Sequence, residues 1–275
     1  MSVRVISGVS IGDVPKTPAT PFTDEPTPVA DGSLIEQAIK LGQPFGYLQE
    51  QGGRLIQNIV PVHKLEFDQI SSSSKVELEM HTETAFHPYM PNYVLLLCMR
   101  GDITAETTYS LLEDILENLD ESVISTLKTD MFYMGIDQSF RTESEPEVFI
   151  RRQILSDDEQ RLVYDSVLMT PMTEDASIAL SAVSSAIQKT KRSIVLNDGD
   201  LLIIDNYRTV HGRKPFQPRY DGTDRWLKRC LVLDGFPPKS EYEGRVITTK
   251  LEKFGMSELE LKQASVAQLD RAEHF

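Results

Sequence analysis

The feature that most constrains the fold is the distribution of short apolar stretches around segments with helical spacing. Strand-like stretches, with apolar runs or apolar–polar alternation, lie at residues 45–62, 75–83, 93–100, 193–213 and 225–236. Apolar residues recur at helical spacing in 32–42, 105–129 and 176–192. Strands on both sides of a helical stretch, without regular strand–helix alternation, favour a β-sandwich or jelly-roll core with helices outside it over a doubly wound sheet.

The chain is expected to form a single domain over residues 1–275, because no repeat and no linker of domain size interrupts it. Residues 1–32 are predicted to be a proline-rich N-terminal arm, with five prolines in 13–32 that favour extended backbone over helix. Residues 131–160 mix aromatic and charged side chains without periodicity, which predicts a loop-rich lid over a site. Residues 240–275 are expected to be a polar helix or a frayed tail.

Composition excludes several classes of partner. A formal net charge of −14 argues against nucleic acid and against anionic membranes. The longest apolar runs are far shorter than the roughly 20 residues of a membrane-spanning helix, and the first residues lack the pattern of a signal peptide. Cys98 and Cys230 lie in apolar runs and are expected to be buried, reduced thiols. We therefore expect a soluble, cytoplasmic protein.

A metal site is suggested by the segment "MHTE". Residues i and i+2 of a strand point to the same face, so His81 and Glu83 would present an imidazole and a carboxylate side by side. A third ligand must come from elsewhere, and His211 is the best candidate because it follows a buried strand and is flanked by arginine and glycine. The remaining histidines lie in loops, before a polar strand or in the tail, namely His63, His87 and His274.

Two histidines and one carboxylate, with open positions, form the facial triad of non-haem Fe(II) oxygenases. A zinc site would more often recruit cysteine or a third histidine. Oxidative decarboxylation of a 2-oxo acid can supply the electrons that O₂ activation needs, and arginine pairs well with the distal carboxylate of such an acid. Arg225 and Arg229 lie on the strand that follows His211. The alternatives are a chance His-x-Glu triplet and an exposed arginine pair on an edge strand.

Three segments carry a resemblance to a known family. They are "FGYLQEQGGRLIQNIVP", "VELEMHTETAFHPYMPNYVLLLCMRGD" and "DGDLLIIDNYRTVHGRKPFQPRYDGTDRWLKR", and they span roughly residues 40–235. In their residues and in their order along the chain they resemble the clavaminate-synthase-like branch of the Fe(II)/2-oxoglutarate-dependent oxygenases, near the asparagine and arginine 3-hydroxylases. The resemblance implies a mainly β fold with a double-stranded β-helix (jelly-roll) core flanked by α-helices. It also implies Fe(II) as cofactor, with 2-oxoglutarate and O₂ as cosubstrates.

Carried over position by position, the resemblance implies that His81, Glu83 and His211 bind the iron. Arg225 would pair with the distal carboxylate of 2-oxoglutarate, helped by the hydroxyl of Thr107 rather than that of Thr108. The carboxylate of Glu83 favours hydroxylation, because halogenases of this superfamily have a small residue in its place.

The same resemblance implies a substrate site. Arg229 would receive the α-carboxylate of an amino acid, while Gln51 and the serine run, at Ser71 or Ser72, would hold its backbone atoms beside Glu83. Asp165 would recognise the side chain of the substrate. Residue 163 is valine where arginine-specific relatives have a second acid, which puts a guanidinium substrate in question.

The expected function is therefore hydroxylation of a free L-amino acid with a polar or basic side chain, at C3 or at C4. An oxidative cyclase or desaturase on the same fold is the nearest alternative, since substrate placement decides between these outcomes. A non-catalytic cupin-like binding protein and a zinc hydrolase are alternatives of other classes. The expected partner is a small molecule.

Overall fold

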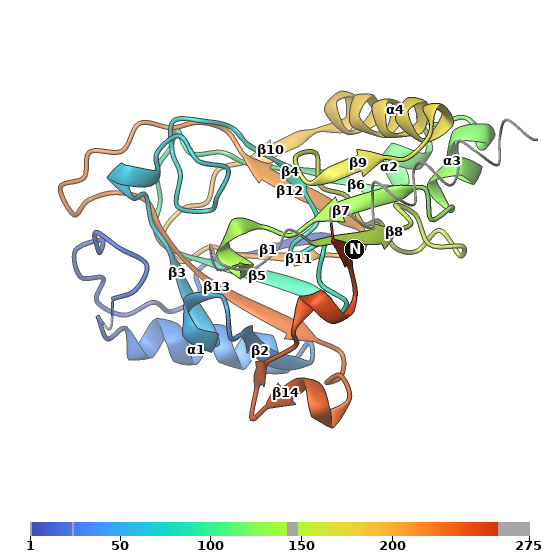
Figure 1. Cartoon of the computed structure of the whole chain (residues 1–275). Coiled ribbons are helices and arrows are strands. Elements are labelled where there is room, and N and C mark those ends of the chain that lie inside the picture. Colours follow the sequence, from blue (N-terminus) through green and yellow to red (C-terminus); the bar gives the residue numbers. More distant parts are fainter. Residues whose placement is uncertain (1, 24, 142–147, 258–275) are drawn as a thin grey trace, which may run out of the picture.

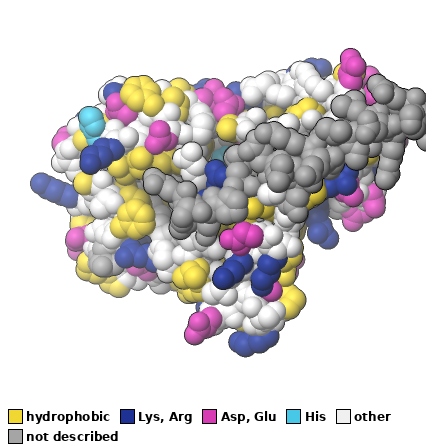
Figure 2. Space-filling model, viewed as in Figure 1, with side chains coloured by type: hydrophobic (Ala, Val, Ile, Leu, Met, Phe, Trp, Pro, Cys, Tyr) yellow, Lys and Arg dark blue, Asp and Glu magenta, His cyan; other side chains and the backbone are white. Residues whose placement is uncertain are grey.

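The structure is a computed structural model that describes residues 2–23, 25–141 and 148–257. Within these residues the chain is β-rich, with an eight-stranded sheet, two four-stranded sheets and four α-helices (Figure 1). No helix in the described ranges is both long and apolar enough to cross a membrane. On the face shown in Figure 2, acidic and basic side chains are interspersed rather than gathered by sign.

The largest sheet is built around the two long apolar strands of the sequence. Its order is β1-β11-β5-β13-β2-β15-β14, and β3 also pairs with β13. The bounds are β1 Val3–Ile6, β11 Leu201–Asp205, β5 Tyr93–Arg100, β13 Trp226–Leu233, β2 Gln43–Tyr47, β15 Val246–Ile247, β14 Tyr242–Glu243 and β3 Ile56–Ile59. β2 and β3 follow one another along the same edge of β13, with the glycine turn near Gly52 between them.

Alternation along the central strands divides the core into two layers. Leu96 and Cys98 of β5 belong to the larger apolar cluster, whereas Leu95 and Leu97 belong to a second cluster with the buried face of helix α1 (Pro28–Ile39). On β13, Lys228 likewise points to α1, where it pairs with Asp31 at 2.7 Å. Because side chains alternate along a strand, the odd-numbered residues of β13 face the opposite side, toward the site described below.

The second sheet has the order β10-β6-β12-β4. Its strands are β10 Arg192–Ile194, β6 Thr107–Leu111, β12 Thr209–Arg213 and β4 Leu78–His81. Helices α2 (Leu112–Leu116), α3 (Glu121–Leu127) and α4 (Glu174–Thr190) pack together beside it, and α4 contacts β6 (Figure 1). The candidate metal and arginine sites lie on this sheet and the larger one, with Glu83 just after β4 and Arg225 just before β13.

Two sequence predictions on this sheet were wrong. Residues 105–129 were expected to form one helix, but 107–111 form strand β6, and α2 and α3 follow it. The β-branched Thr107 and Thr108 favour the extended backbone, and pairing with both β10 and β12 overrides the apolar spacing. His211 was expected in a turn, but it lies in the middle of β12.

The third sheet has the order β16-β8-β7-β9, with β16 Met256–Ser257, β8 Val148–Arg152, β7 Phe132–Gly135 and β9 Met169–Pro171. The segment 131–160, expected to be loop-rich, therefore contains two paired strands and the 3-10 turn Gln138–Phe140. Buried side chains such as Phe132 and Ile150 anchor it to the main core, so tertiary packing outweighs the missing periodicity.

The predictions at the two ends also need correction. In the N-terminal arm, residues 3–6 form strand β1, and α1 begins at Pro28, several residues before the expected start. Proline is suited to the first turn of a helix because its missing N–H would have no helical partner there. Residues 240–257 form short strands and 3-10 turns instead of a polar helix; 258–275 lie outside the described residues.

Candidate active site

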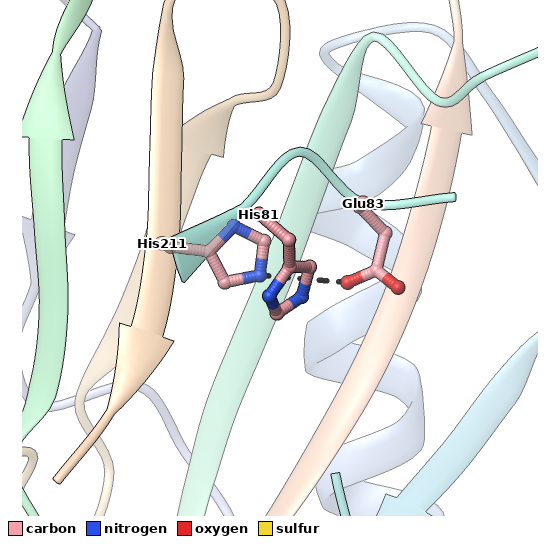
Figure 3. Close-up of side chains that lie close together, drawn as sticks. All are labelled: His81, Glu83 and His211. Carbon is pink, nitrogen blue, oxygen red and sulfur yellow. Dashed lines mark ion pairs between the residues drawn. The ribbon is translucent and has the colours of Figure 1, made fainter. Parts of the chain in front are cut away.

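Three side chains that are far apart in the sequence meet at the edge of the second sheet. His81 ends β4 and lies opposite His211 of β12 in the strand register, while Glu83 follows β4 directly. One potential ligand atom from each residue lies within 4.8 Å of the others, and the side chains point toward one another (Figure 3). The imidazole rings are 4.6 Å apart between centroids. Two imidazoles and one carboxylate are the donor set that suits Fe(II).

The orientation of His81 is set by its own strand. Its Nδ1 lies 2.7 Å from the backbone oxygen of Glu79. A carbonyl oxygen can only accept, so Nδ1 carries the proton and Nε2 keeps its lone pair. This is the usual second interaction of a metal-binding histidine, and it leaves Nε2 available as a ligand.

Glu83 is held at both its backbone and its carboxylate. The buried side chain of Asn206 accepts a hydrogen bond from Glu83 N at 2.8 Å and donates one to Glu83 O at 3.1 Å. Arg229 Nη1 donates to Glu83 Oε1 at 2.8 Å. Although burial would raise the pKa of Glu83, the Arg229 charge and the hydrogen bond from His211 lower it well below its usual range. The residue is therefore an ionised carboxylate.

His211 completes the cluster on β12. Its Nε2 lies 3.5 Å from Glu83 Oε2, the carboxylate oxygen that Arg229 does not contact. Burial lowers the pKa of His211 more than the neighbouring carboxylate raises it, so the ring is neutral. A neutral imidazole beside an ionised carboxylate is the protonation state that a divalent cation requires.

Arg225 and Thr107 lie together in the cavity that His81, Glu83 and His211 also line. Arg225 is 7% exposed and donates to Thr107 Oγ1 at 3.3 Å. Thr108, the other threonine considered, instead donates to the sulfur of Met80 at 3.4 Å. Burial lowers the pKa of Arg225 to about 10, and no carboxylate among the described residues forms an ion pair with it. This buried cation suits an anionic ligand.

Arg229 is surrounded by acceptors. Besides Glu83 it contacts the carboxylate of Glu50 and donates to Gln57 Oε1 through Nε at 2.8 Å. Although burial opposes it, the charges of Glu50 and Glu83 raise the pKa of Arg229 above its usual value. Burial raises the pKa of Glu50, although Arg229 opposes that effect. Sequence analysis missed Glu50; its place beside Gln51 in the glycine turn was the available signal.

A cavity of about 450 Å³ joins these groups. Gln51, Ser71, Ser72 and Asp165, all expected at a substrate site, line it together with the three candidate metal ligands and both arginines. The Oε1 atom of Gln51 is buried without a hydrogen-bond partner in the described structure, which leaves an acceptor for a ligand. Asp165 accepts hydrogen bonds from the backbone of Val167 and Leu168 through Oδ1. Its backbone also forms an isolated antiparallel β-bridge with that of His81.

Two further expectations concern residues outside the cluster. His87 is fully buried against the rings of Tyr47 and Phe140, away from the candidate metal ligands, as its place in a loop suggested. Val163 packs against the apolar core and does not line the cavity. Asn206 was not identified from the sequence, although it directly follows the apolar run of β11.

The sequence of this chain is similar to those of known proteins. The family model described as "Taurine catabolism dioxygenase TauD, TfdA family" matches residues 34–231. An L-asparagine oxygenase of Streptomyces coelicolor is 37% identical over 222 residues, which cover 76% of this chain and 66% of that protein. The chain thus spans slightly less than two thirds of that relative.

Solved structures of two related proteins also match this chain. Asparagine oxygenase in complex with Fe(II), 2S,3S-3-hydroxyasparagine and succinate matches with a TM-score of 0.82 and 32% identity, over 90% of this chain and 80% of that one. The non-heme iron oxygenase OrfP in complex with Fe, succinate and (3S)-hydroxy-L-Arg matches with a TM-score of 0.81 and 30% identity, over 90% and 82% of the two chains.

Proposed function

Because the chain belongs to the taurine catabolism dioxygenase TauD, TfdA family, we propose that it is an Fe(II)- and 2-oxoglutarate-dependent hydroxylase of a free L-amino acid. The observation that carries the proposal is that His81, Glu83 and His211 converge in one cavity with the buried Arg225 and Arg229. We further propose that the sheet of β5 and β13 and the sheet of β6 and β12 form the two faces of a double-stranded β-helix core.

The metal would be held by Nε2 of His81, Nε2 of His211 and the Oε2 side of Glu83. The ionised carboxylate of Glu83 and the neutral ring of His211 support this assignment. A cation would replace the proton that His211 Nε2 shares with Glu83, and that proton can move to the unpartnered Nδ1. With 2-oxoglutarate bound, Fe(II) would supply the oxidation, while decarboxylation of the 2-oxo acid gives succinate and the electrons needed beyond those of the C–H bond. Succinate in both matched complexes fits this chemistry.

Arg225 and Thr107 would hold the distal carboxylate of 2-oxoglutarate. A guanidinium presents paired N–H donors that match a carboxylate, and the threonine hydroxyl can donate a further hydrogen bond. The 3.3 Å contact between the two side chains places both donors on one side of the cavity. Burial strengthens the pairing because little water competes for the carboxylate.

The α-carboxylate of the substrate would bind Arg229. Two carboxylates, Glu50 and Glu83, share this single guanidinium. When Glu83 binds a cation, Glu50 is left able to accept the α-ammonium group of an amino acid. The unpaired Gln51 Oε1 and the hydroxyls of Ser71 and Ser72 would complete the backbone site.

The substrate side chain would lie near Asp165. This residue, Glu79 and Asp137 give the cavity three carboxylates besides Glu50 and Glu83, which favours a basic or amide-bearing side chain. Hydroxyasparagine and hydroxyarginine in the matched complexes are products of these two kinds. Hydroxylation at C3 is the proposal, by analogy with those products.

Residues 131–160 would act as a lid. Asp137, Ser139 and Phe140 of this segment line the cavity, and Phe140 packs against Phe86 with ring centroids 4.9 Å apart. A segment in this position would exclude water from the bound substrate during oxidation.

The test measures succinate formation from 2-oxoglutarate by the purified protein in air, with Fe(II) and a panel of free L-amino acids. We expect turnover that requires Fe(II) and rises with a basic or amide amino acid, and loss of that turnover in His81→Ala. The matched control is His63→Ala, an exposed histidine outside the cavity, which should keep full activity. Turnover that persists in His81→Ala, or that prefers zinc and needs no oxygen, would contradict the proposal.

A further inference from the structure

A third arginine, Arg213, lies in the same cavity and has no role in the proposed function. It is the last residue of β12, two positions after His211, so both side chains point to the same face of the sheet. It is 3% exposed and lines the cavity.

The contacts of Arg213 fix its position but do not neutralise its charge. Nη2 donates to Ser73 Oγ at 2.9 Å, and Nη1 donates to Ser74 O at 3.3 Å and Lys214 O at 3.2 Å. The guanidinium carbon lies 5.0 Å from the ring centroid of Phe216. Its Nε is buried without a hydrogen-bond partner in the described part of the chain.

Arg213 therefore differs from Arg229, which contacts two carboxylates. Among the described residues no acid pairs with Arg213 or with Arg225, and both guanidiniums are buried. Two buried cations without an acidic partner are costly. An anionic ligand between them would offset this cost.

The strand register places Arg213 beside the proposed cosubstrate site. It lies opposite Thr107 on β6, and Thr107 Oγ1 accepts the hydrogen bond of Arg225. Arg213 is thus the cross-strand neighbour of the threonine to which Arg225, directly before β13, donates. This arrangement suits a carboxylate that receives donors from both sides.

We propose that Arg213 is a second cationic residue of the cosubstrate site, which pairs with the distal carboxylate of 2-oxoglutarate together with Arg225 and Thr107. The proposal rests on the proposed function. Ser73 and Ser74 would hold the guanidinium in place. Of the four serines in the run, Ser71 and Ser72 would then contact the substrate, while Ser73 and Ser74 would position Arg213 for the cosubstrate. The site would then select a dicarboxylate over a 2-oxo acid with an uncharged end.

The test is anaerobic calorimetric titration of the full-length protein with Fe(II) present, which measures the dissociation constant directly. The probes are 2-oxoglutarate and 2-oxopentanoate, which has the same chain length but no distal carboxylate. In Arg213→Met, the affinity for 2-oxoglutarate should fall by about tenfold to a hundredfold, the loss typical of one charge-assisted interaction. The affinity for 2-oxopentanoate should stay within about twofold, because that ligand has no charge for Arg213 to contact.

Two more variants separate this role from a structural one. Arg213→Lys keeps the charge and should lose less affinity than Arg213→Met, and Arg219→Met removes an exposed arginine six residues away and should change neither constant. Equal losses for both probes, or equal effects of lysine and methionine, would overturn the proposal. If the unaltered protein binds neither probe, the proposed function itself fails; if it binds 2-oxoglutarate and Arg213→Met binds equally well, only the role of Arg213 fails.

Discussion

Arg229 and Glu83 are joined by a 2.8 Å hydrogen bond from Nη1 to Oε1. One of these residues is proposed to hold the substrate α-carboxylate and the other to bind the metal. The contact therefore connects substrate binding to the orientation of a metal ligand. Glu50 and Gln57, which contact the rest of the guanidinium, keep this connection in a fixed geometry.

Arg229→Gln should raise the KM for the amino acid by about a hundredfold, because the buried α-carboxylate of the substrate would lose its charged partner. Steady-state kinetics at saturating 2-oxoglutarate measure this change. The control is Lys228→Gln, the neighbouring residue, whose side chain faces α1 and pairs with Asp31. That variant should be less stable but should leave KM unchanged; a similar rise in KM would show that the effect is structural.

Asn206→Ala should weaken Fe(II) binding by about tenfold to a hundredfold, because the side chain that fixes the backbone of Glu83 is lost. It should also lower the free energy of unfolding by about 1–3 kcal/mol, since buried backbone groups lose their partners. Metal titration and urea unfolding measure the two effects. Asn118→Ala, in an exposed turn after α2, should change neither quantity; unchanged metal affinity in Asn206→Ala would refute the positioning role.

Local strand geometry was enough to predict that His81 and Glu83 lie side by side, and the structure brings them together with His211. Arg229 lies on the face of β13 that the alternation predicts, and Arg225 comes directly before that strand. Arg213 could not be found in this way, because its contacts with Ser73 and Ser74 join segments that are distant in the sequence. Glu50 lies beside Gln51, but its pairing with Arg229 is also a long-range contact that no local pattern encodes.

His87 should make the stability of the protein depend on pH. Burial, helped by the nearby Arg152 charge, lowers its pKa from 6.5 to about 3. The unfolded chain takes up a proton below pH 6.5 but the folded chain does not, so the free energy of unfolding should fall by roughly 1.4 kcal/mol per pH unit between these values. Urea unfolding at pH 7 and pH 5 should show a smaller difference in His87→Phe than in the unaltered protein.

The control for this effect is His63→Phe, since His63 is exposed. It should keep the full pH dependence. Equal slopes for His87→Phe and the unaltered protein would show that other groups carry the effect.

Asp165→Asn should change the choice of substrate. The amide keeps the shape of the side chain and the oxygen that accepts from Val167 and Leu168, but it removes the charge. The ratio of kcat/KM for a basic over an amide-bearing amino acid should fall by about tenfold, the value of one charge interaction. Asp158→Asn, at an exposed loop, is the matched control. An unchanged ratio would remove Asp165 from the side-chain site.

The errors at the level of secondary structure have a common cause. Residues 107–111 and 132–135 lack a clear strand pattern, yet each pairs with strands on both sides. A strand between two neighbours gains its stability from their hydrogen bonds and from burial rather than from local preference. The assignment of Thr107 to a helix followed from reading spacing alone, although its identification as a site residue did not depend on that assignment.

Labelling with ¹⁸O₂ tests most directly whether the protein is an Fe(II)- and 2-oxoglutarate-dependent hydroxylase. The purified protein is supplied with Fe(II), 2-oxoglutarate and the amino acid that gives the highest turnover, and both products are analysed by mass spectrometry. We expect one labelled oxygen atom in the amino acid, one in succinate, and equal amounts of the two products. Unlabelled products, or an amino acid labelled only when H₂¹⁸O is supplied, would show that the site does not act as a dioxygenase.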